Sequence, residues 1–224
     1  MTLASDQLHG RLGRRFTIAG TSPYESVDWE QRDARLIDHR DGSVAFEQLG
    51  VEFPSDWSVT ASNIVTQKYF RGSDATGGRE HSLRQVIDRV VGAICEWGVR
   101  DGYFADAEEA ASFADELRFL LVRQYVSFNS PVWFNIGVPD VAQQASACFI
   151  LDVEDDLRSI LNWYAEEGMI FKGGSGAGAN LSKIRSSKEQ LSGGGTPSGP
   201  VSFMRGADAS AGTIKSGGTT RRAA

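Results

Sequence analysis

The stretch EEGMIFKGGSGAGANLSKIRSS, from Glu166 to Ser187, marks the change of character on which the fold assignment depends. It begins at the end of a helical pattern, Val153 to Glu167, with Gly168 placed as the helix C-cap. From Met169 onward the chain holds 8 Lys and Arg against 2 Asp and Glu, and 12 of the 25 glycines. The residues before it hold 15 basic and 27 acidic side chains. An acidic body is thus followed by a basic, glycine-rich segment, which suits a small polyanion.

Three glycine-rich loops lie in this second part: KGGSGAGAN at Lys172 to Asn180, LSGGGTPSGP at Leu191 to Pro200 and KSGGTTRR at Lys215 to Arg222. Glycine turns let backbone N–H groups converge on an anion and let the chain approach a ligand closely. Neither standard nucleotide-binding fingerprint is present. A P-loop needs Lys-Ser/Thr after its second glycine, but Gly173 to Gly178 is followed by Ala-Asn. A dinucleotide fold needs GxGxxG, but Gly174, Gly176 and Gly178 give only GxGxG. The loops are therefore either flexible connectors or an anion site whose charge comes from nearby basic residues: Arg185, Lys188, Lys215, Arg221 and Arg222.

Two helices with clear start signals precede the glycine-rich part. Ser82 and Gln85 have capping-box spacing, and apolar residues repeat after them at helical intervals. Asp106 with Glu109 opens the second helix. We expect irregular structure over residues 1–52 and a mainly helical domain over residues 53–126. An extended stretch, Ser127 to Gly137, and a short buried strand, Ala147 to Leu151, then open the region 127–224.

The overall composition is that of a globular protein and excludes several classes. The chain has 224 residues, 41% hydrophobic and 23% charged, and a formal net charge of −6, which argues against a general nucleic-acid binder. No apolar run approaches the roughly 18 residues of a membrane span, and the N-terminus lacks a signal-peptide core. Three histidines and two cysteines show no metal-ligand spacing and no disulfide framework. We expect a cytoplasmic protein with no metal site, membrane or nucleic-acid partner.

The two cysteines differ in their surroundings. Cys95 lies beside the apolar stripe of the first predicted helix, which is typical of a buried structural thiol. Cys148 follows small and polar residues in QQASACFIL, at the start of the predicted strand. The local sequence leaves two interpretations of Cys148 open, a plain core cysteine and a redox thiol.

Several segments together carry a family resemblance. FNSPVWFNIG, SACFI, VEDDLRSIL, EEGMIFKGGSGAGANLSKIRSS, LSGGGTPSGPVSFMRG and IKSGGTTRRAA, in this order and spacing, closely resemble the adenosylcobalamin-dependent (class II) ribonucleotide reductases. WSVTASNIVTQKYFRG is similar to the N-terminal domain of the longer members, so the resemblance runs from Trp57 to the end. It implies an α+β fold, in which a mainly helical N-terminal domain is followed by the first elements of an incomplete ten-stranded α/β barrel with substrate and effector loops.

The resemblance also implies a reaction and a substrate site. In this family the ribose 2′-carbon of a ribonucleotide is reduced by radical chemistry that starts from adenosylcobalamin and a thiyl radical. Two further cysteines supply the electrons as they form a disulfide, and Cys148 matches the first of that redox pair. Ser130, Ala147, Cys148 and Gly176 match positions that contact the substrate nucleotide.

A second nucleotide site is implied for regulation. Asp155 and Arg185 match positions that bind the deoxyribose and triphosphate of a dNTP effector in this family. The segment Leu191 to Pro200 resembles the family's loop beside that effector. The segment Lys215 to Arg222, which includes Arg221, resembles the loop that carries effector identity to the substrate in this family. The implied partners are a ribonucleoside di- or triphosphate substrate, a dNTP effector, a second subunit in a homodimer and a thioredoxin-like reductant.

The sequence departs from the family after Ala224, where members continue with further barrel strands. It holds no later cysteine for the thiyl radical or for the second redox thiol, and no cobalamin-contacting region. We therefore expect the N-terminal portion of a ribonucleotide reductase that is inactive alone and binds no cobalamin by itself. The alternatives are one half of a split reductase, a dNTP-binding regulatory module, and an unstable remnant with exposed strand edges.

Overall fold

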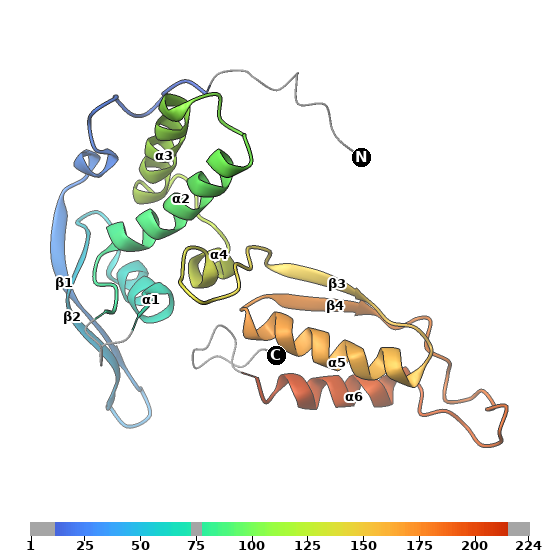
Figure 1. The fold of residues 1–224 in the computed structure, drawn as a ribbon. Coiled ribbons are helices and arrows are strands. Elements are labelled where there is room, and N and C mark those ends of the chain that lie inside the picture. Colours follow the sequence, from blue (N-terminus) through green and yellow to red (C-terminus); the bar gives the residue numbers. More distant parts are fainter. Residues whose placement is uncertain (1–11, 73–77, 215–224) are drawn as a thin grey trace. The chain divides into compact units, whose positions relative to one another are not determined.

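The structure, a computed structural model, describes residues 12–72 and 78–214 (Figure 1). Its elements mix helices and strands, in agreement with the α+β expectation. The chain divides into two compact units, one made of Met1–Phe128 and Ile136–Pro139, the other of Asn129–Asn135 and Asp140–Ala224. We call them unit 1 and unit 2. Within the described residues no helix combines the length and the apolar character that crossing a bilayer requires.

Unit 1 contains the two helices predicted from their capping residues. Helix α2 (Leu83–Arg100) begins with a complete capping box formed by Ser82 and Gln85. Helix α3 (Ala107–Val122) begins after Asp106, whose side chain accepts the Glu109 N–H at 2.8 Å. A further helix, α1 (Val59–Tyr69), fills the segment that the sequence left unassigned.

The expectation of irregular structure over residues 1–52 is wrong for its second half. A short 3₁₀ helix, η1 (Pro23–Ser26), is followed by an antiparallel hairpin of β1 (Trp29–Ile37) and β2 (Val44–Pro54). The hairpin escaped detection because the burial of β1 does not alternate and both strands carry charged residues. Arg32 in β1 is used structurally, since its guanidinium donates to the carbonyl oxygens of Pro54, Ser55 and Trp57.

The segment Leu12–Thr17 is held on helix α3 by acidic side chains. Glu109 accepts the backbone N–H of Leu12 at 2.6 Å. Glu116 accepts the N–H groups of Arg15, Phe16 and Thr17 at 3.1, 3.0 and 2.8 Å, and also the Thr17 hydroxyl. Burial raises the pKa of Glu116, but the hydrogen bonds from Thr17, Phe16 and Arg15 outweigh it and lower that pKa below its usual range. The carboxylate thus stays charged and keeps the segment docked at neutral pH.

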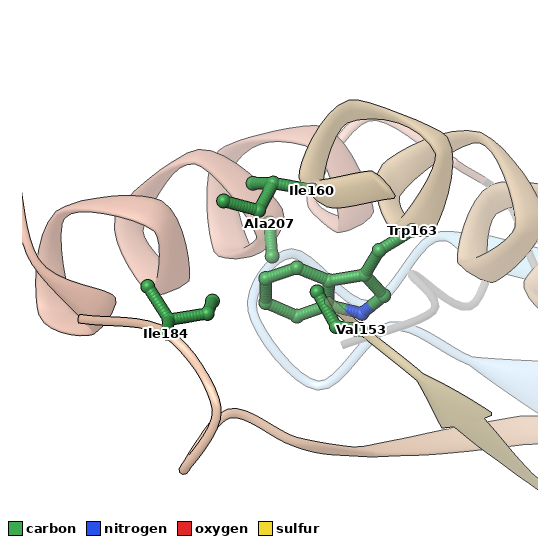
Figure 2. Close-up of a cluster of buried hydrophobic side chains, with 5 residues drawn as sticks. All are labelled: Val153, Ile160, Trp163, Ile184 and Ala207. Carbon is green, nitrogen blue, oxygen red and sulfur yellow. The ribbon is translucent and has the colours of Figure 1, made fainter. Parts of the chain in front are cut away.

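Unit 2 is built around a parallel strand pair with a helix on one side (Figure 1). Strand β3 (Cys148–Asp152) leads through α5 (Leu157–Lys172) to β4 (Gly176–Asn180), which pairs with β3 in parallel. Helix α6 (Pro200–Ala211) packs against α5. The core lies between these elements, with Leu151 of β3 and Ala179 of β4 packed against a buried cluster of Val153, Ile160, Trp163, Ile184 and Ala207 (Figure 2).

Three sequence expectations for unit 2 need correction. The stretch Ser127 to Gly137 is not extended throughout but contains helix α4 (Ser130–Asn135), because proline is compatible with the first turn of a helix. The predicted strand exists, but Cys148 is exposed and Ile150 is 84% exposed, so the described residues leave one of its faces uncovered. Helix α5 does not end at Gly168 but runs to Lys172.

Candidate functional site

The Cys148 thiol lies on the uncovered face of the β3–β4 pair. In the register of this pair Cys148 is opposite Gly176 and Ile150 is opposite Gly178. Register partners point to the same face of a sheet and alternate residues to opposite faces. One face therefore carries Cys148 and Ile150 with two glycines beside them, and the other carries Leu151 and Ala179 against the core.

The glycine opposite the thiol leaves open space. A Cβ built on Gly176 would have the Ala147 carbonyl oxygen, at 3.8 Å, as its nearest neighbour. The Gly176 N–H donates to that same oxygen at 2.7 Å, which fixes the start of β4 beside the start of β3. Three of the four residues predicted for the substrate, Ala147, Cys148 and Gly176, are thus brought together. The fourth, Ser130, is the first residue of α4, on a separate element of the same unit.

A second candidate site is formed by Asp155 and Arg185. The Arg185 Nε donates to the Asp155 Oδ2 at 2.6 Å, and the Arg185 backbone N–H lies 3.2 Å from the other carboxylate oxygen. The Arg185 guanidinium and backbone N–H lower the pKa of the Asp155 carboxyl. The structure therefore joins two residues that are far apart in sequence in one charged pair.

This pair borders a pocket of about 340 Å³. The loop after Leu191 contributes Leu191, Pro197, Ser198 and Gly199 to its wall, so the predicted loop and the predicted pair meet at one place. The lining also includes Asp156, Leu157, Ile160, Ile184 and Phe203. A pocket of this size is within the range of small-ligand sites.

The helix predicted from Val153 to Glu167 begins at Leu157 instead, with Asp156 as its N-cap, and the Asp156 side chain accepts the Ser159 N–H at 3.0 Å. Asp155 is thereby left to pair with Arg185. The predicted effector residues Lys215 and Arg221 lie outside the described residues.

Lys183 provides a second cation two residues before Arg185, with different partners. Its amine lies 2.8 Å from Asp152 and 2.5 Å from Glu154, in exposed ion pairs. Lys183 is absent from the lining of the pocket. The two basic residues of this loop therefore have separate surroundings, and only Arg185 faces the pocket.

The second cysteine, Cys95, is half-buried in helix α2. Burial raises the pKa of its thiol, which disfavours the reactive thiolate. In the described parts of the chain no three His, Cys, Asp or Glu side chains gather as a metal site would require.

Sequence reasoning missed the polar residues that support the substrate face. Asn135 and Ser175 are both buried, at 4% and 5% exposure, and Gln144 lies between them in a hydrogen-bonded network. All three lie inside quoted segments, Asn135 in FNSPVWFNIG, Gln144 in QQASACFIL and Ser175 in KGGSGAGAN, but none has a spacing that signals a role.

Comparison with protein families gives two matches that together span most of the chain. Residues 31–124 match the family model described as class II vitamin B12-dependent ribonucleotide reductase. Residues 146–224 match the model described as ribonucleotide reductase, barrel domain. The first match covers most of unit 1, and the second covers the β3–β4 pair and both candidate sites except Ser130.

Individual relatives agree with these matches. A vitamin B12-dependent ribonucleotide reductase of Streptomyces coelicolor is 63% identical over 214 residues, which is 96% of this chain and 22% of the relative. The protein of the same description in Rhodopirellula baltica is 43% identical, over 92% of this chain and 22% of the relative. A vitamin B12-dependent ribonucleoside-diphosphate reductase of Mycobacterium tuberculosis is 33% identical, over 78% and 24%. The chain thus spans about a fifth of the length of the relatives it matches.

Proposed function

Since the chain belongs to the class II, vitamin B12-dependent ribonucleotide reductase family, we propose that it supplies the first redox thiol and the effector pocket of such an enzyme. The observation that carries the proposal is the pairing of Cys148 with Gly176 on one open sheet face. The reaction is the conversion of ribonucleotides to deoxyribonucleotides, on the ten-stranded barrel that the family implies.

The thiol face suits a ribose that must lie against a reducing group. Gly176 has no side chain and nothing within 3.8 Å of its would-be Cβ, so a nucleotide can lie on β4 next to the Cys148 sulfur. In the overall balance, one ribonucleotide and two thiols give one deoxyribonucleotide, one disulfide and one water. Cys148 supplies one thiol, and a second cysteine of the complete enzyme supplies the other. Ser130 and the backbone of Ala147 complete the substrate contacts.

The pocket at Asp155 and Arg185 is proposed as the dNTP effector site. Arg185 offers charge-assisted hydrogen bonds to phosphate, and the charged Asp155 carboxylate can accept a sugar hydroxyl. Lys215 and Arg221 are proposed to join this site on sequence grounds. The same pocket favours a second candidate function, a regulatory module that binds nucleotide without chemistry, and this candidate needs no second cysteine.

The cofactor of the family, adenosylcobalamin, initiates the radical when it is bound. A corrin ring with its axial groups is much larger than the 340 Å³ pocket beside Arg185, so that pocket does not fit it. We therefore derive no step through the cofactor and assign the chain only substrate and effector contacts. A thioredoxin-like protein is the proposed reductant.

A homodimer interface is proposed on helix α5. Ile160 faces the core at 3% exposure, whereas Leu157 and Leu161 on the same helix are 62% and 53% exposed. Ile160 thus serves the core, and we assign the exposed Leu157 and Leu161 to contact with a second subunit.

A chimera tests the proposed function. This chain replaces the matching segment of the Streptomyces coelicolor relative, and deoxyribonucleotide formation is measured with adenosylcobalamin and a dithiol. The variant Cys148→Ser should abolish turnover, and the matched variant Cys95→Ser should retain it. Turnover by Cys148→Ser at the parental rate would refute the thiol assignment. Gly176→Val in the same chimera should raise KM for substrate, because its side chain would occupy the open space on β4.

A further inference from the structure

Three polar residues lie at the point where the two strands of the thiol face begin. Asn135 ends helix α4, Gln144 precedes β3, and Ser175 precedes β4. They come from three separate segments of unit 2, and none of them belongs to the substrate or effector sets proposed above. Their hydrogen bonds all end on backbone carbonyl groups or on one another.

Asn135 joins the segments before the two strands. Its side-chain Nδ2 lies 3.1 Å from the Gln144 carbonyl oxygen and 2.9 Å from the Gly173 carbonyl oxygen, and 2.8 Å from the Pro131 carbonyl of its own helix. The residue is 4% exposed, so water does not replace these partners. One amide therefore bridges the chain entering β3 and the chain entering β4.

Gln144 and Ser175 extend this bridge to the residue two positions before the thiol. The Gln144 Nε2 donates to the Ser175 Oγ at 2.5 Å, and that hydroxyl donates to the Ser146 carbonyl oxygen at 2.5 Å. The next bond in line is the Gly176 N–H to the Ala147 carbonyl at 2.7 Å, after which the strand register begins. We call the side-chain hydrogen bonds of Asn135, Gln144 and Ser175 the relay. They connect α4 with the residues before β3 and before β4, up to the first pair of the sheet.

We propose that Asn135, Gln144 and Ser175 are positioning residues that hold Cys148 opposite Gly176. A parallel pair of two short strands has few bonds of its own, and a shift of one residue would turn the thiol to the opposite face. Buried donors and acceptors that are fully paired define one arrangement, because any shift leaves them without partners. The relay acts through the backbone of residues 146 and 147 and does not touch substrate. The inference rests on the proposed role of Cys148.

Two adjacent glutamines give a matched pair of variants. Gln144→Met removes the relay donor with little change in side-chain length. Gln143→Met makes the same change at the neighbouring exposed residue, whose amide donates to the nearby Val141 carbonyl oxygen at 2.7 Å. Ser175→Ala removes the hydroxyl and keeps the backbone. Each variant is made in the full chain, also with Cys95→Ser so that a trifluoromethyl tag reports on Cys148 alone.

The first measurement is hydrogen exchange of the Gly176 amide by NMR, and the second is the ¹⁹F signal of the tagged thiol. Gln144→Met and Ser175→Ala should each speed Gly176 exchange about tenfold or more, the loss expected for one buried hydrogen-bond partner. The ¹⁹F line should shift or split in both. Gln143→Met should match the parent in both measurements, and amides of α2 in unit 1 should keep their protection.

Exchange within twofold of the parent and an unchanged ¹⁹F line in both relay variants would overturn the proposal. Loss of protection throughout unit 2 in both variants would also overturn it, because the relay would then serve general stability. Neither readout requires turnover. Turnover of the chimera with Cys148→Ser can therefore refute the redox role of the thiol while the positioning result stands. Likewise, unchanged exchange and ¹⁹F signals can refute the positioning role while the redox role stands.

Discussion

Replacement of Arg185 by alanine tests the effector pocket most directly. The guanidinium pairs with Asp155 at 2.6 Å and lines the pocket of about 340 Å³. A hydrogen bond to a charged group contributes about 1.5–3 kcal/mol. The side chains of Arg185 and Asp155 are 41% and 30% exposed, so solvent screening favours the lower end of that range. A loss of about 1.5 kcal/mol corresponds to roughly tenfold weaker dNTP binding.

The assay is equilibrium binding of each dNTP to the full chain, by calorimetry or equilibrium dialysis at fixed salt. Lys183→Ala is the matched control, because it removes an ion-paired cation two residues away that does not line the pocket. We expect Arg185→Ala to bind about tenfold more weakly and Lys183→Ala to bind within twofold of the parent. Equal losses in both variants would mean that only the general charge of the loop matters. Unchanged binding in Arg185→Ala would refute the assignment of the pocket.

Two further predictions concern packing and thiol reactivity. Gly98→Ala should lower the free energy of unfolding by about 1–3 kcal/mol, because the new Cβ would lie 2.4 Å from the Phe104 ring. Gly92→Ala in the same helix places its Cβ where nothing lies within 4 Å, so it should raise the free energy of unfolding by about 0.5–1 kcal/mol. Urea unfolding of both variants checks the signs, and destabilisation by Gly92→Ala would contradict them. A maleimide at limiting concentration should modify the exposed Cys148 before the half-buried Cys95, whose pKa burial raises. Peptide mass spectrometry gives the order, and faster modification of Cys95 would show that the exposures are assigned wrongly.

Some of the elements that the sequence predicted correctly have local start signals. Helices α2 and α3 begin at Ser82 and Asp106 because side chains a few residues apart satisfy free N–H groups, which a sequence displays directly. The β1–β2 hairpin lacks such a signal. Its Arg32 is a charged residue in a strand, and the carbonyl partners that explain it come from a later segment.

In the candidate sites, too, the identity of the residues could be predicted from the sequence, whereas their contacts could not. The glycine-rich composition and the family resemblance selected Cys148, Gly176, Asp155 and Arg185 without any knowledge of distances. That Asp155 forms an ion pair with Arg185 depends on the fold, as does the exposure of Cys148 in this structure. The assignments of these residues to substrate and effector stay predictions.

The connection between β3 and β4 has a consequence for the order of folding. The segment between the two strands contains only helix α5, so Cys148 and Gly176 meet when a loop of moderate length closes. The entropy cost of closing a loop grows only slowly with the number of residues in it. The docking of Leu12–Thr17 on α3 instead joins residues about a hundred positions apart in sequence. Contacts of long sequence separation form slowly. We therefore expect the β3–α5–β4 unit to gain protection early in refolding and the N-terminal segment to dock last.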